Sequence, residues 1–281
     1  MTNLIKMDLH RLVRSVSFWV MLVTVIGLAF FSTGMTKYDL DTSTEPSLSL
    51  EADADVQISL GISVPTNYEW IDGEIPCSEL VNINFASRLM LILCVIFIPL
   101  FVNGESKHGF IKNIAGQLSS RGLLILSKLI AAAVQVFIIL AVYVVFTAVA
   151  GRIWWGERFV PGPMTDLLEI FGLHYLLHFA FGAVVLMLTI LFRSSALSMT
   201  FGILCSSGFS ALAYNVINIA LHSAGVSKKF DFGRYMIESN IGCVTSGLEQ
   251  NDLLRIIIVG AAFTAVSVVI SMTVIQKRDI R

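Results

Sequence analysis

The segment Asn103–Lys128, NGESKHGFIKNIAGQLSSRGLLILSK, decides how the rest of the chain is arranged. It is polar, and a long apolar run precedes and follows it. It contains one acid and four bases: Glu105, Lys107, Lys112, Arg121 and Lys128. Cationic loops between membrane spans stay in the cytoplasm. We therefore expect this loop to face the cytosol, where a partner protein could contact it.

The composition indicates a membrane protein. Hydrophobic residues make up 56% of the 281 residues and charged residues 14%, whereas a soluble domain has about 25% charged residues. This apolar content exceeds what one protein core needs, so lipid must cover part of it. The sequence has no strongly basic surface, and we expect no nucleic-acid partner.

Six long apolar runs account for most of the chain. Because a membrane span needs about 20 apolar residues, they predict an all-α polytopic membrane protein with six transmembrane helices. These are 17–35, 81–102, 129–150, 167–191, 196–221 and 253–275. Arg88 interrupts the second run near its outer end, where a long side chain can reach the interface. A place on a substrate path is the alternative for Arg88.

The segment before the first span has apolar and basic residues at helical spacing. We expect residues 1–16 to form an amphipathic helix in the membrane interface, although an extension of the first span is the alternative. The first apolar run exceeds the 7–15 residues of a signal peptide and no A-x-A-like site follows, so we interpret it as a retained anchor.

Two longer polar segments are expected on the outer side. Residues 37–79 contain ten acids and one base and are too long for a turn, and alternation at 58–64 predicts a short strand. We expect an extracytoplasmic lobe here and a second outer segment at 222–252. With both termini inside, the inner segments hold eleven Lys or Arg and three acids, and the outer segments seven and seventeen. This asymmetry places both termini in the cytoplasm.

The sequence lacks the residues typical of ion-coupled transport, nucleotide binding and hydrolysis. No Asp or Glu lies deep within any expected span, so coupling to a proton or sodium gradient is disfavoured. The phosphate loop G-x-x-x-x-G-K-[ST] and the hydrolase motifs H-E-x-x-H and G-x-S-x-G do not occur. His174 and His178 share a helical face, but a metal needs more ligands. We expect polar packing there and no metal.

Small residues recur every four positions in the fifth run: Ser194, Ser198, Gly202, Ser206 and Ser210. Such a stripe lets two helices approach closely in lipid. It indicates either packing within one subunit or contact between two copies or paralogues, and Ser198, Gly202, Ser206 and Ser210 are the candidate interface residues.

Two of the cysteines, Cys77 and Cys243, fall on the expected outer segments. Disulfides persist on that side of a membrane. We therefore hypothesise that Cys77 and Cys243 pair.

The central loop resembles the permease subunits of bacterial ABC-2-type ABC transporters. These have an acidic residue after the second span, a glycine, and then an arginine and a lysine before the third span, matched here by Glu105, Gly109, Arg121 and Lys128. The start of the chain, IKMDLHRLVRSVSFWV, resembles their interfacial connecting helix, and the six-span layout agrees throughout. The acidic first outer segment is most similar to the bacitracin-resistance and lantibiotic-immunity subgroup.

The resemblance implies one ABC-2 (type V exporter-like) transmembrane domain over residues 1–281 in the bacterial cytoplasmic membrane. A coupling loop at 103–128 would contact a separate ATPase, present in two copies, through Glu105, Gly109, Lys112, Arg121 and Lys128. The second permease would be another copy or a paralogue.

The implied function is ATP-driven export or clearance of an amphipathic peptide, antibiotic or lipid-like compound. The chain itself would be no enzyme and hold no cofactor, because ATP and Mg would bind to the ATPase. A membrane sensor or resistance protein that captures a ligand with its outer lobe is the alternative.

Overall fold

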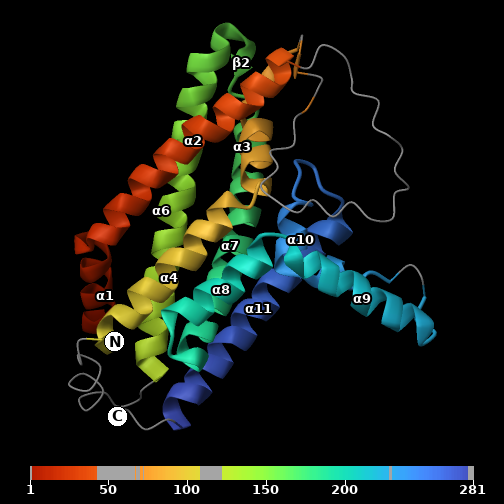
Figure 1. Ribbon diagram of the computed structural model, residues 1–281. Helices are drawn as coiled ribbons and strands as arrows, with labels where there is room; N and C mark the ends of the chain where they lie inside the picture. Colours follow the sequence, from red (N-terminus) through yellow and green to blue (C-terminus); the bar gives the residue numbers. More distant parts are fainter. Residues whose placement is uncertain are drawn as a thin grey trace.

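A computed structural model describes residues 2–42, 67, 70–71, 73–107, 122–227 and 230–277, without the side chains of 105–107. Long helices dominate it (Figure 1). The helices are α1 (Thr2–Arg14), α2 (Val16–Thr42), α3 (Cys77–Ala86), α4 (Leu89–Lys107), α6 (Gly122–Trp155), α7 (Met164–Phe192), α8 (Ser195–Ser206), α9 (Phe209–Ser223), α10 (Ile237–Ile241) and α11 (Gln250–Lys277). Two-residue strands β1 (Ile75–Pro76) and β2 (Phe159–Val160) and 3-10 turns η2 (Gly156–Arg158) and η3 (Phe232–Tyr235) complete the described elements.

The apolar helices are those of a multi-pass membrane protein. Within the described residues, α2, α6, α7 and α11 are each long and apolar enough to cross a membrane. The pairs α3–α4 and α8–α9 each meet the same test only when taken together, which gives up to six spans. The expectation of an all-α polytopic membrane protein is confirmed at this level.

Two predicted spans are not continuous helices. The second bends by 57° between α3 and α4, where Arg88 has a φ of +63°, uncommon for a residue other than glycine. The fifth bends by 67° between α8 and α9, where Gly208 has a φ of +88° that glycine adopts without steric cost. The expected spans 81–102 and 196–221 therefore each contain a bend.

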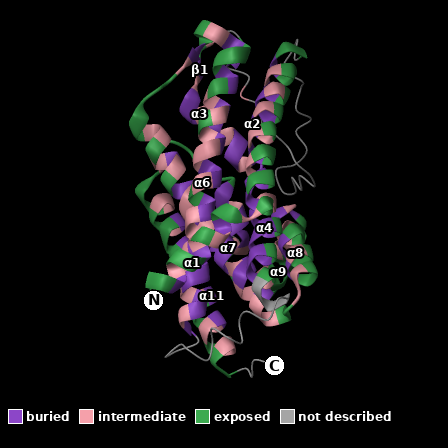
Figure 2. Cartoon of the chain, turned by 90° about the vertical axis from the view of Figure 1, so that its left-hand side faces the viewer, coloured by how far each residue is buried: buried purple, intermediate pink, exposed green. Residues whose placement is uncertain are grey.

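The core lies where α3, α4, α6 and α7 meet. α7 packs on α4, α6 and α11, and α2 packs on α6. Phe85 of α3 stacks on Tyr143 of α6 with 5.6 Å between ring centroids, and the Tyr143 hydroxyl hydrogen-bonds the Ser32 hydroxyl of α2 at 2.8 Å. Figure 2 shows the buried residues gathered inside the bundle and exposed ones on the outward sides of the helices. The stacked rings and the buried hydrogen bond thus hold α2, α3 and α6 together.

One end of the bundle is closed by a contact that we call the clasp. β1 and β2 pair in parallel, with Ile75 opposite Phe159. The Arg158 guanidinium donates hydrogen bonds to the carbonyls of Trp70, Ile71 and Gly73. The clasp therefore joins the chain before α3 to the connection between α6 and α7. The strand predicted at 58–64 lies outside the described residues.

The opposite end, which we call the loop end, gathers segments far apart in the sequence. α1, the end of α4, the start of α6 and the end of α11 all lie there (Figure 1). The α4 helix ends at Lys107 and α6 begins at Gly122, so the residues that flank 108–121 on both sides lie at this end. α6 and α7 both run between the two ends: α7 begins at Met164, just after β2, and Ser195 beyond its end hydrogen-bonds Asn103 near the end of α4.

Candidate functional site: a buried ionic cluster at the loop end

The N-terminal helix presents an acid to the interior of the protein. Leu4, Asp8 and Leu12 are the buried residues of α1, and their spacing of four places them on one face. This face packs against α6. The Asp8 side chain is only 1% exposed. A charge this deeply buried is stable only when other groups pair with it.

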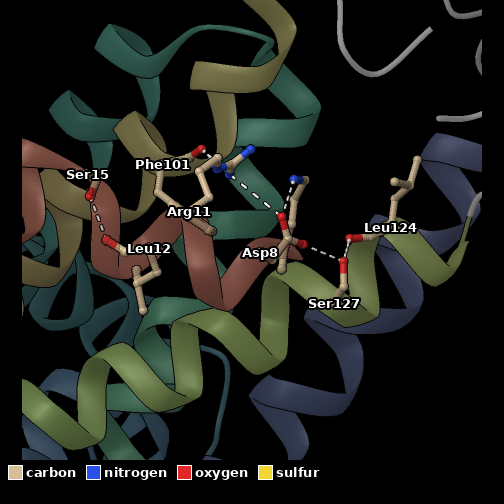
Figure 3. Close-up of polar contacts among 8 residues, drawn as sticks. Asp8, Arg11, Leu12, Ser15, Phe101, Leu124 and Ser127 are labelled. Atoms are coloured by element: carbon tan, nitrogen blue, oxygen red, sulfur yellow. Dashed lines mark hydrogen bonds and ion pairs between the residues drawn. The ribbon is translucent and has the colours of Figure 1, made fainter. Parts of the chain in front are cut away.

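Residues of α1 and α6 supply those partners (Figure 3). The Nζ atom of Lys128 lies 3.9 Å from Asp8 Oδ1 and is itself buried. Arg11 Nη2 lies at the same distance from that oxygen. The Ser127 hydroxyl donates a 2.6 Å hydrogen bond to Asp8 Oδ2. Both carboxylate oxygens of Asp8 therefore face a positive or donating group.

The end of α4 joins the same cluster through Phe101. Arg11 Nη2 donates to the Phe101 carbonyl at 3.0 Å, and the Arg11 guanidinium carbon lies 4.2 Å from the centre of the Phe101 ring. Lys128 Nζ lies 6.0 Å from that centre. Both cations thus approach an aromatic face, which attracts positive charge. We call Asp8, Arg11, Phe101, Ser127 and Lys128 the Asp8 cluster.

The Asp8 cluster connects both stems of the central loop to the N-terminal helix. Phe101 lies in the last two turns of α4, and Ser127 and Lys128 lie in the second turn of α6. Breaking a buried ion pair by removing one partner costs about 3–5 kcal/mol. α1, α4 and α6 therefore resist separation at this end.

The structure describes only some of the residues predicted to couple to an ATPase. Lys128 is buried in the Asp8 cluster, where its ammonium group faces Asp8. Glu105 lies in the last turn of α4, but its side chain is not described, and Gly109, Lys112 and Arg121 lie outside the described residues. Sequence reasoning missed Asp8. An acid midway between Leu4 and Leu12 was the available signal.

Three residues of the small-residue stripe pack inside this chain. Ser198, Gly202 and Ser206 are the buried residues of α8. A Cβ atom on Gly202 would lie 2.6 Å from Val95 Cγ1 of α4, so the absence of a side chain allows α8 and α4 to touch. Contact of the stripe with a second subunit stays a prediction.

The stripe continues beyond its predicted end, which sequence reasoning also missed. Tyr214, Asn218 and His222 extend the spacing of four along α9. The Tyr214 hydroxyl donates to the buried carboxylate of Glu238, and Asn218 Nδ2 donates to Asp231 at 2.8 Å. His222 Nε2 lies 2.9 Å from the Phe230 carbonyl. This polar face fastens α9 to the segment 230–238.

Residues 55–281 match the model of a family described as a protein of unknown function, DUF2705. The chain belongs to the DUF2705 family. A search of the curated proteins found no match to it. The match includes Phe101, Ser127 and Lys128 of the Asp8 cluster, while α1 precedes it.

In this DUF2705 chain the remaining candidate residues are dispersed. Arg88 is half-buried at the bend between α3 and α4. The thiols of Cys77 and Cys243 are free, the first buried in α3 and the second exposed after α10. Within the described ranges, no three His, Cys, Asp or Glu side chains gather as metal ligands would.

Proposed function

We propose that this chain is the permease subunit of an ATP-driven ABC transporter of the ABC-2 type in a bacterial cytoplasmic membrane. It would act with two copies of a separate ATPase subunit and with a second permease, either another copy or a paralogue. The substrate class is an amphipathic peptide, an antibiotic or a lipid-like compound, exported or cleared from the membrane. The single observation that carries the proposal is the Asp8 cluster, which joins α1 to both stems of the loop 108–121.

The cluster supports the proposal because such a transporter receives its energy as movement of a cytosolic partner. A loop that binds the ATPase must pass that movement to the spans. Here α4 and α6 leave the loop directly, and α1 reaches the first span, α2, through Ser15. Since all three helices meet in one buried ionic cluster, a pull on the loop acts on several spans at once.

A transporter also needs a structural element that can adopt two arrangements, and the bent spans are candidates for it. Conformational switching in proteins uses hinges and packed helices that shift between discrete positions. The bends at Ser87–Arg88 and Ser207–Gly208 interrupt α3–α4 and α8–α9, and α4 packs on α8. Movement of α4 from the loop end would therefore change the contact between the two bent spans.

The proposal is tested by purifying the chain from native membranes with its partners and reconstituting the complex in proteoliposomes. An ATPase subunit should copurify, and candidate substrates should stimulate its activity. Glu105→Ala and Arg121→Ala should insert normally but uncouple ATP hydrolysis from transport. Arg152→Ala is the matched control, because Arg152 is exposed near the clasp and pairs with Glu157. Wild-type transport by both loop variants would contradict the proposal.

A further inference from the structure

A second buried polar cluster lies where α7 meets α3, away from the Asp8 cluster. His174 and His178 of α7 and Phe85 of α3 have no exposed surface. The Phe85 ring lies 4.9 Å from the His174 ring and 6.1 Å from the His178 ring, between centroids. The two imidazoles are 5.8 Å apart. These contacts make one site of the two histidines and α3.

The hydrogen bonds determine which nitrogen of His174 carries the proton. Asn82 Nδ2 donates to the Val244 carbonyl at 2.8 Å, so the other side of this amide, Oδ1, faces His174 Nε2 at 2.9 Å. An amide oxygen can only accept. His174 Nε2 therefore carries hydrogen, and Nδ1 has the lone pair of a neutral imidazole.

The same reasoning applies to His178 with the opposite result. Its Nδ1 lies 2.8 Å from the carbonyl oxygen of His174, one turn earlier in α7. A carbonyl oxygen also only accepts, so Nδ1 carries the hydrogen and Nε2 has the lone pair. The two rings are thus opposite tautomers, and each keeps one free acceptor.

Two acceptors in this cluster lack a donor among the described residues. They are His174 Nδ1 and His178 Nε2. A buried acceptor without a partner costs about 1–3 kcal/mol. Since both atoms accept, the partner must be a species that donates hydrogen bonds or carries positive charge.

The surroundings favour a neutral donor. A metal ion or an ammonium group would lose its hydration without meeting a negative charge, because two imidazoles and an amide are neutral. Through the described parts of the chain, no third His, Cys, Asp or Glu completes a metal site here. Water donates two hydrogen bonds without charge, and buried waters usually bind such leftover polar groups.

We propose that this cluster is a hydration site, in which ordered water donates hydrogen bonds to the free nitrogens of His174 and His178. It lies in the membrane-spanning part of the chain, about one turn before the bend at Ser87–Arg88, where Phe85 and Asn82 of α3 contact the two rings.

The test is magic-angle-spinning NMR on the full chain in lipid nanodiscs, with its five histidines labelled with ¹⁵N. We expect two neutral rings of opposite tautomer, whose unprotonated nitrogens receive magnetisation from water as quickly as the exposed His10 does. The variants His174→Gln and His178→Gln assign the signals. If neither variant folds, substitution of the other three histidines by Gln leaves only His174 and His178, and their opposite tautomers then distinguish the two rings by their chemical shifts.

Three results would overturn the proposal. The first is no transfer from water to either unprotonated nitrogen at mixing times that suffice for His10. The second is the chemical shifts of an imidazolium ring near neutral pH, which would mean that a proton occupies the site. The third is a selective change of these two signals on addition of micromolar Zn²⁺ or Cu²⁺, which would mean that the cluster is a metal site.

Discussion

Asp8 Oδ1 of α1 lies 3.9 Å from Nζ of Lys128 in α6, and both side chains are almost completely buried. Neither charge can reach water while the two helices remain in contact. Each therefore depends on the other, and the free energy of unfolding should respond more to the loss of one than to the loss of both.

We predict that Asp8→Asn lowers the free energy of unfolding by about 3 kcal/mol, because Lys128 and Arg11 then lose the anion between them. The measurement is the thermal unfolding temperature of the protein in nanodiscs. Glu249→Gln is the control, since Glu249 is exposed, and it should leave that temperature unchanged.

The double variant Asp8→Asn with Lys128→Met should recover at least half of this loss. It removes both members of the pair, and Met keeps the length of the lysine chain beside Phe101. Comparison of the two single variants with the double variant measures their coupling. Simple addition of the two single effects would mean that Asp8 and Lys128 do not interact.

Gly202 and Gly172 form a matched pair for the contact between α8 and α4. Gly202→Ala should destabilise the chain by about 1–3 kcal/mol, because its Cβ would meet Val95. Gly172→Ala should be neutral or stabilising by up to about 1 kcal/mol, because its Cβ would enter open space and alanine favours helix. Unfolding temperatures of both variants check this. Equal shifts would mean that α8 does not press on α4.

The four cysteines should react with a maleimide at different rates. Without reductant, Cys243 should be alkylated readily, because its thiol is free and exposed. Cys77 and Cys94 are buried and should react only after unfolding. Intact mass measured at successive times gives the number of alkylated cysteines. If neither Cys77 nor Cys243 reacts until reductant is added, the two form the disulfide hypothesised from the sequence.

Arg158→Lys should loosen the clasp, because an ammonium group cannot reach the three carbonyls that the guanidinium fork contacts together. We expect faster amide hydrogen exchange at Ile75 and Phe159 and a loss of about 1 kcal/mol, since the site is exposed. Arg152→Lys, in a single exposed ion pair, should leave exchange at both amides unchanged. Unaltered exchange in Arg158→Lys would show that β1 and β2 pair without it.

Much of the architecture could be predicted from the distribution of charge. The predicted spans 17–35, 129–150, 167–191 and 253–275 all lie within α2, α6, α7 and α11, because lipid requires a long uncharged helix wherever the chain crosses it. The helices extend further at most of their ends, since an apolar run marks the lipid-covered part and not the helix itself. The separate helix before the first span was also predicted, and α1 ends at Arg14.

The bends and the Asp8 cluster could not be predicted in this way. Ser87–Arg88 contains neither glycine nor proline, the residues that usually mark a break in a helix, and Phe85 just before the break stacks on Tyr143 of a distant helix. The position of Asp8 on the helix was readable, but its burial depends on Lys128, which lies far away in the sequence. Pairs of this kind are decided by which helices pack together.

The length of α6 has a mechanical consequence. Its 34 residues span about 51 Å at 1.5 Å per residue, so the helix is longer than the hydrocarbon layer of about 30 Å is thick. Lys128 is fixed near one tip, and Trp155 at the other adjoins β2. If α6 tilts as a rigid helix, both of its ends move. A movement at the loop end would therefore reach the clasp without any ligand passing between them.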